Sequence, residues 1–202
     1  MIAPLEHPPA GALDDADLIA RSTAEPEAFA ELYDRHAAGL HRYVLRRLGA
    51  GPADDVVGET FLIAFRERAR YDAARREARP WLYGIAARLI GRHRRSEVRA
   101  YRALARTGVD PVAASWADSV EGQVAAQAAR VPLAAALGAL SDGDRHVLLL
   151  VAWADFSYDE VATALGIPLG TVRSRLNRAR KKMRAALGGV DPTQPTEPED
   201  QR

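Results

Sequence analysis

The chain has 202 residues, no cysteine and a formal net charge of +1; 48% of its residues are hydrophobic and only 6% are aromatic. The absence of cysteine excludes disulfides, thiolate metal sites and thiol nucleophiles. The N-terminus has no basic start or apolar core, and no apolar run approaches the ~18 residues that span a bilayer, so we expect a cytoplasmic protein without a membrane segment.

Positive and negative charges are segregated along the chain. Residues 66–106 contain thirteen arginines and only four acidic residues. Residues 173–184 contain seven basic residues and no acidic residue. Residues 107–129, by contrast, hold three acids and no base. Two basic stretches joined by an acidic tether indicate a polyanionic partner that is contacted at two places, although either stretch alone could be a solvated helix face.

Ala, Leu and Arg dominate the composition, which predicts an all-α fold of two small helical domains joined by a flexible linker. We expect the first domain to span residues 14–106. It holds one helix rich in periodic apolar residues, a second that starts at Asp54 or Asp55, and a third that runs from Pro80 at least to Arg95. The expected core residues are Phe29, Leu32, Tyr33, Leu40, Val44 and Leu48, then Val56, Val57, Thr60, Phe61, Ala64 and Phe65, then Leu82, Ile85, Ala86 and Leu89.

Three further segments have the composition of flexible chain. Residues 1–13 are rich in Pro and Gly and are expected to be disordered, and residues 107–127 have the small residues of a linker. Residues 189–202 are acidic and Pro-rich, which also indicates disorder. The second domain is therefore expected at residues 128–188.

A helix-turn-helix is the most specific pattern in this second domain. Ser141 to Asp144 resembles a capping box with Asp in the Glu position, and Ser157 to Glu160 forms a better one that opens a short helix. Gly166 is suited to a left-handed cap at the end of that helix, and Pro168 to the start of the next. A short helix, a turn at Gly and a longer helix make up the helix-turn-helix signature.

The last helix, from Pro168 to Leu187, has one apolar face and one basic face. Val172, Leu176, Ala179 and Met183 recur at helical spacing and are expected to face the core. The opposite face carries the candidate DNA contacts Thr171, Arg173, Ser174, Asn177, Arg178 and Lys181. Arg can bond bidentately to guanine and Asn to adenine, so Arg173, Ser174, Asn177 and Arg178 are the candidate base readers. The alternative is a basic surface helix that binds nothing.

The segment SYDEVATALGIPLGTVRSRLNRARKKMRAAL, preceded by LGALSDGDRHVLLLVAW, resembles the fourth region of the extracytoplasmic-function (ECF) sigma factors of bacterial RNA polymerase, in the sigma-70 superfamily. AFAELYDRHAAGLHRYVLRRLG, ADDVVGETFLIAFR and RPWLYGIAARLIGRHRR are similar, in order, to that family's second region. The resemblance implies a sigma factor that binds core polymerase, directs it to promoters and helps open the −10 element. It further implies that the second region binds polymerase and melts the −10 element, and that the fourth reads the −35 element.

The resemblance also assigns roles to particular residues. The polymerase clamp helices would contact Asp55, Glu59, Thr60 and Phe61, and the flap is the second polymerase site. The −10 element would be contacted by Arg79, Trp81, Tyr83, Arg88, Arg92 and Arg95, although for Trp81 core packing is slightly favoured over stacking on a base. The candidate readers in the last helix would contact the −35 element. Gly58, Arg88 and Arg92 depart from the family's usual Gln, Asn and Asp. The resemblance is also compatible with an anti-sigma factor as a further partner.

Two other classes of function compete with a sigma factor. A self-sufficient helix-turn-helix regulator would bind palindromic DNA as a dimer, but no apolar helix is left over for a dimer interface. An enzyme is disfavoured, because no nucleophile motif or Gly-rich phosphate loop is present and the five histidines show no metal-binding spacing. These are His7, His36, His41, His93 and His146. No cofactor or metal is expected.

Overall fold

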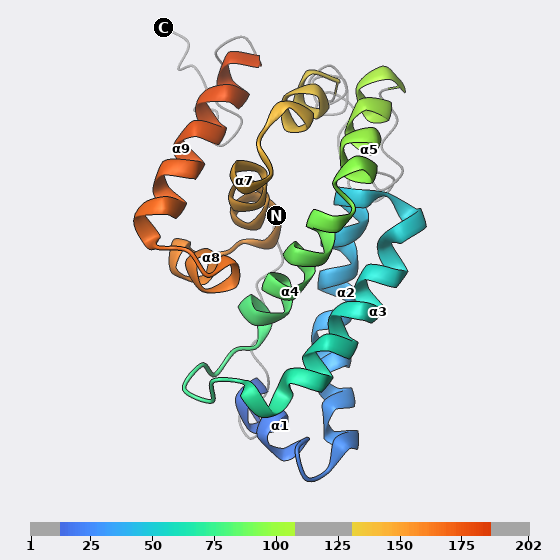
Figure 1. Cartoon of the computed structure of the whole chain (residues 1–202), viewed down its shortest axis with the longest axis vertical. Helices are drawn as coiled ribbons and strands as arrows, with labels where there is room; N and C mark the ends of the chain where they lie inside the picture. Colours follow the sequence, from blue (N-terminus) through green and yellow to red (C-terminus); the bar gives the residue numbers. More distant parts are fainter. Residues whose placement is uncertain (1–12, 108–130, 187–202) are drawn as a thin grey trace, which may run out of the picture.

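A computed structural model describes residues 13–107 and 131–186 (Figure 1). These residues form helices and connecting turns, with no strand in either described range. None of their helices is long and apolar enough to cross a bilayer. The disorder expected for residues 1–12 and 189–202, and the linker expected from residue 108 onward, lie outside the described residues.

The N-terminal half is a set of helices around α2. Its elements are α1 (Asp15–Arg21), the 3-10 turn η1 (Pro26–Ala28), α2 (Phe29–Leu48), α3 (Ala50–Glu67), the 3-10 turn η2 (Arg68–Arg70), α4 (Arg79–Arg92) and α5 (Arg94–Thr107). The apolar stripes of α2, α3 and α4 face one another and form the core. Tyr33 is the exception among the predicted core residues: it is 47% exposed, and its ring lies on Phe61 at the surface.

Two predicted helix boundaries are wrong. The second helix begins at Ala50 rather than at Asp54 or Asp55, because Gly49 turns the chain with a φ of 81° and Pro52 is tolerated in the first turn. The third helix does not continue to Arg95. It ends at Arg92, and His93, with φ −91° and ψ 15°, redirects the chain into α5.

The C-terminal half contains the predicted helix-turn-helix. Residues 131–139 are helical and are followed by α7 (Asp142–Ala154), α8 (Tyr158–Leu165) and α9 (Leu169–Ala186). Both halves of the Ser157–Glu160 capping box are formed, and Gly166 closes α8 in the left-handed region with a φ of 62°. At the start of α7 only half of the predicted box forms: Ser141 caps the Asp144 N–H, whereas the Asp144 carboxylate turns to Arg178.

The two halves pack against each other, with α8 on α4 (Figure 1). The contact is close because α4 has a glycine there: a Cβ on Gly84 would lie 2.2 Å from the carbonyl oxygen of Ala164. Beside it, Tyr83 of α4 packs on Phe156 at 5.1 Å between ring centroids, and Arg79 donates a hydrogen bond to the Ala154 carbonyl. The described parts of both halves thus share one continuous core.

A buried cluster of charges joins the halves at a second place. Glu97 of α5 accepts hydrogen bonds from Arg47 of α2, at 2.7 Å from Nε, and from Arg145 of α7, at 2.8 Å from Nη1. All three side chains are at most 2% exposed. Arg47 also donates to Nδ1 of His146 at 2.7 Å. We call Arg47, Glu97 and Arg145 the Glu97 junction.

The Glu97 junction makes stability depend on pH through His146. Burial, followed by the charges of Arg47, Arg145 and Arg175, lowers the pKa of His146 to about 3. Between this value and the ordinary pKa of about 6.5, only the unfolded chain binds a proton, so stability falls as pH decreases below 6.5. We expect His146 to reduce the free energy of unfolding by at most about 1.4 kcal/mol per pH unit in this range. Urea unfolding of the native chain and of His146→Gln at pH 7.5 and 5.5 measures it; a difference between the two proteins that is independent of pH would contradict it.

The contact of α8 with α4 can be tested at Gly84. Gly84→Ala places a methyl group against backbone, which cannot move aside as a flexible side chain would, so α8 should leave α4 and the radius of gyration in solution scattering should increase. Gly91→Ala is the matched control, because it lies on the same helix with open space around its Cβ. Gly91→Ala should leave the radius unchanged. If Gly84→Ala also has the native radius, the contact is not as described.

Candidate nucleic-acid interfaces

The helix α9 presents a basic face to solvent. Val172, Leu176, Ala179 and Met183 are buried, which confirms the predicted apolar face. On the opposite face, Arg173, Asn177 and Lys181 are exposed, as are Ser174 and Arg178, while Thr171 is half-buried. The structure therefore brings the predicted residues of this helix together on one surface.

Two of these residues already have partners inside the protein. The Ser174 hydroxyl donates to the Thr171 carbonyl at 3.0 Å. Arg178 donates to the Asp144 carboxylate at 2.9 Å and ties α9 to α7. Burial raises the pKa of Asp144, but hydrogen bonds from Arg178 and Ser141 outweigh it and hold the pKa below its ordinary value. Arg178 thus has a structural role in addition to any contact with DNA.

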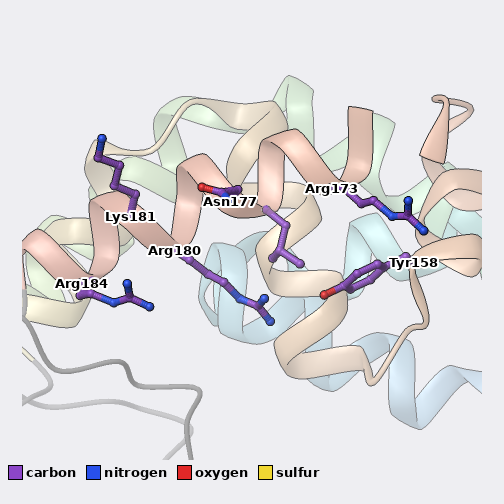
Figure 2. A pocket seen from close by; sticks show the side chains of 7 residues that line it. Tyr158, Arg173, Asn177, Arg180, Lys181 and Arg184 are labelled. Atoms are coloured by element: carbon purple, nitrogen blue, oxygen red, sulfur yellow. The ribbon is translucent and has the colours of Figure 1, made fainter. Parts of the chain in front are cut away.

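A hollow of about 560 Å³ lies along one side of α9. Figure 2 shows the Arg180 guanidinium and the Tyr158 hydroxyl pointing toward each other there, whereas Lys181 points away on the other side of the helix. The lining residues are Tyr158, Arg173, Leu176, Asn177, Arg180, Lys181 and Arg184. Donors line the hollow without a single carboxylate, and Nε of Arg180 is buried with no hydrogen-bond partner among the described residues.

Sequence reasoning missed Tyr158, Arg180 and Arg184 as candidate contacts. The signal was present, because Arg173, Asn177, Arg180 and Arg184 follow one another at spacings of four, three and four and so share a helix stripe. Such a stripe of donors is suited to base edges and to phosphate oxygens.

The predicted −10 residues are divided between an exposed group and a covered group. Arg88, Arg92 and Arg95 are exposed, and Arg92 pairs with Glu59 at 3.2 Å. Tyr83 is only 4% exposed because its ring packs on Tyr43 and on Phe156, and Arg79, which is half-buried, is engaged with Ala154. The structure thus leaves Tyr83 and Arg79 unavailable to DNA while α8 lies on α4.

Trp81, the remaining predicted −10 residue, is half-buried. Its ring lies 4.9 Å from that of Tyr71, centroid to centroid, at an angle of 53°. Trp81 therefore packs against the molecule with part of its surface accessible, an arrangement that serves both of the roles considered for it.

The predicted polymerase contacts are likewise divided. Asp55 and Glu59 are exposed on α3, but Thr60 and Phe61 are buried, and the Thr60 hydroxyl donates to the Val56 carbonyl at 2.7 Å. Next to the exposed acids, a hollow of about 790 Å³ opens between α2 and α3 at Gly58, whose Cβ position has no neighbour within 4 Å. Its lining residues are Tyr33, Ala37, Ala38, His41, Arg42, Asp54, Val57 and Gly58.

Two of the described histidines, His36 and His41, lie against carboxylates. His36 lies 2.7 Å from an oxygen of Asp15 and His41 lies 2.9 Å from one of Asp54. No group of three His, Cys, Asp or Glu residues placed to hold a metal occurs within residues 13–107 and 131–186.

Comparison with known families gives two matches. Residues 32–107 match the model of sigma-70 region 2, and residues 130–183 match that of sigma-70 region 4. The ECF RNA polymerase sigma factor SigL of Mycobacterium tuberculosis is 36% identical over 167 residues, which cover 82% of this chain and 92% of SigL.

A second relative has a solved structure. The RNA polymerase sigma factor CnrH of Cupriavidus metallidurans is 33% identical over 184 residues, which cover 86% of this chain and 95% of CnrH. The structure of CnrH in complex with the cytosolic domain of CnrY is similar to this chain with a TM-score of 0.60, at 28% identity, over 86% of this chain and 97% of that chain.

Proposed function

Since this chain belongs to the ECF sigma factors of the sigma-70 family, which direct RNA polymerase to promoters, we propose that it grips promoter DNA with two separate surfaces. The C-terminal half would bind the −35 element and the N-terminal half would bind and help open the −10 element. The observation that carries the proposal is the exposed, acid-free face of α9 in a helix-turn-helix whose first helix, α8, is capped at both ends. In this proposal the chain acts in the cytoplasm and contributes to transcription by binding polymerase and DNA, and not by catalysing a reaction.

At the −35 element, α9 is the reading helix. Its 18 residues are about 27 Å long at 1.5 Å per residue, which is enough to cross a major groove. Arg173 and Asn177 are assigned to base edges because they are exposed. Tyr158, Arg180 and Arg184 line the adjacent hollow and are assigned to the phosphate backbone.

At the −10 element, the exposed arginines of α4 and α5 would neutralise phosphates while Trp81 stacks on an unpaired base. Arg79 and Tyr83 could join them only after α8 leaves α4, since Phe156 and Ala154 occupy them in this structure. We propose that binding to core polymerase supplies this opening. The exposed arginines of α4 and α5 would then form one DNA-binding surface together with Arg79 and Tyr83.

The surface around Asp55, Glu59 and Gly58 is our proposed docking site for the clamp helices of the largest polymerase subunit, with the flap as the site for region 4. The exposed carboxylates of Asp55 and Glu59 would attract a basic helical partner. The hollow beside them, which is open at Gly58, has room for a side chain of that partner. An anti-sigma protein is a further proposed partner, because the solved structure of the similar CnrH is a complex with the cytosolic domain of CnrY.

Run-off transcription tests the proposal. Start sites mapped after overexpression of this chain supply the promoters, and core RNA polymerase is then assayed on them with and without the purified chain. We expect the chain to redirect transcription to these starts. If it never changes which promoters the core enzyme uses, the proposal fails, and tight binding of the isolated chain to palindromic DNA as a dimer would point instead to a self-sufficient regulator.

Arg173 is expected to read one base pair. Arg173→Ala should remove about 1–3 kcal/mol of preference at a single position of the −35 element, because a bidentate contact to a guanine edge is lost. The measurement is a binding series on −35 duplexes that differ by one base pair each. An unchanged preference at every position would remove Arg173 from the readers.

Lys181 is expected to contact phosphate rather than bases. Lys181→Ala should weaken binding to all duplexes alike and reduce the salt slope of the binding constant by about one ion. Titrations at several salt concentrations measure the slope, and Arg21→Ala on α1 is the control, because Arg21 pairs with Glu25 far from α9. If the slope of Lys181→Ala equals that of the control, Lys181 faces solvent only.

A further inference from the structure

The loop between η2 and α4, residues 71–78, has its own internal bonding. The Tyr71 hydroxyl lies 2.7 Å from the Arg75 carbonyl oxygen and 3.0 Å from that of Glu77, and so closes the loop from inside. Burial raises the pKa of Tyr71 to about 12, so this hydroxyl keeps its proton and donates. The Asp72 carboxylate accepts from the Ala74 N–H at 3.1 Å. The loop is thereby held in one shape.

The same loop is tied from outside by α1, which lies beside it (Figure 1). The Ala16 N–H donates to the Arg76 carbonyl at 3.2 Å, and Asp14 pairs with the Arg76 guanidinium at 2.6 Å. The Arg75 side chain, which pairs with Asp72, and the Arg76 side chain remain 52% and 81% exposed.

Asp15 is the centre of this attachment. One of its carboxylate oxygens accepts from the Ala78 N–H at 2.9 Å and lies 2.7 Å from Nε2 of His36, while the other lies 3.3 Å from Arg35. Its side chain is only 9% exposed. Burial raises the pKa of Asp15, but His36, the Ala78 N–H and Arg35 outweigh it and hold the pKa below its ordinary value. Asp15 is therefore an anion fixed between α2 and the start of α4.

The start of α4 needs this anion, because no side chain of its own segment caps it. Ala78 stands at the N-cap position and makes no side-chain hydrogen bond. A carboxylate at a helix N-terminus satisfies a free N–H and interacts favourably with the helix dipole. Asp15 supplies it from α1, a helix outside the segment that matches sigma-70 region 2.

We infer that Asp15 is a positioning residue for promoter opening: through the Ala78 N–H it fixes the loop 71–78 and the start of α4, so that Arg75, Arg76 and Trp81 meet the unpaired −10 strand in a preformed arrangement. The inference rests on the proposed function at the −10 element. It assigns to α1 a role in the capture of single-stranded DNA, although none of its residues needs to touch that DNA.

The test uses holoenzyme assembled from core RNA polymerase and the full chain. Its probe is a single-stranded oligonucleotide with the nontemplate −10 sequence of a mapped promoter. Asp15→Asn keeps the side-chain shape but loses the charge and places an amide donor against other donors. Asp17→Asn is the matched control, since Asp17 is an exposed residue of the same helix. Tyr71→Phe removes the internal closure of the loop without altering α1.

We expect Asp15→Asn and Tyr71→Phe each to weaken binding of the oligonucleotide about tenfold, while Asp17→Asn binds it like the native chain. Binding to core polymerase and to a −35 duplex should stay unchanged in all three, which a general loss of folding would not allow. The inference is overturned if Asp15→Asn binds the oligonucleotide within about twofold of the native chain, whatever Tyr71→Phe does, or if Asp15→Asn weakens all three kinds of binding equally. A native holoenzyme that binds neither strand nor duplex would instead refute the proposed function, and the inference with it.

Discussion

The arrangement of the two described halves depends on one carboxylate, that of Glu97, which pairs with two arginines from different halves of the chain. A buried ion pair gains little net free energy, because the desolvation of its charges offsets most of their attraction. It nevertheless favours one arrangement of the two halves, because any arrangement that leaves a buried charge without its partner has a much higher free energy. The Glu97 junction therefore restricts how the C-terminal half docks, while the contact of α8 with α4 adds the burial of apolar surface.

This arrangement suits the opening that we propose. If the C-terminal half moves away, Glu97 keeps Arg47 as its partner, so its charge is not left buried and unpaired. The closed form uses Phe156 and Ala154 to cover Tyr83 and Arg79. The reading face of α9, by contrast, stays exposed in it. The two proposed DNA surfaces therefore differ in availability: one is ready at all times, and the other is complete only in the open form.

Local features of this fold could be predicted from the sequence, and long-range ones could not. The apolar face of α9 and the cap at Gly166 follow from spacing and turn chemistry within a few residues. Thr60 and Phe61 were predicted both as core and as polymerase contacts, and their burial supports the first. The roles of Glu97 and Asp15 depend on partners many residues away. In the sequence, Glu97 lies among the thirteen arginines of residues 66–106, yet it pairs with two arginines outside that range, because the bend at His93 directs α5 toward them.

The position of Glu97 in the chain also has a consequence for synthesis on the ribosome. Arg47 precedes Glu97 by 50 residues, and Arg145 follows it by 48. A domain that folds as it emerges, N-terminal part first, thus meets its first arginine well before the second has been made. The nascent N-terminal half can close around a neutral pair of one acid and one base. Only when translation reaches α7 does the second cation arrive, and it docks onto a carboxylate that is already held in place.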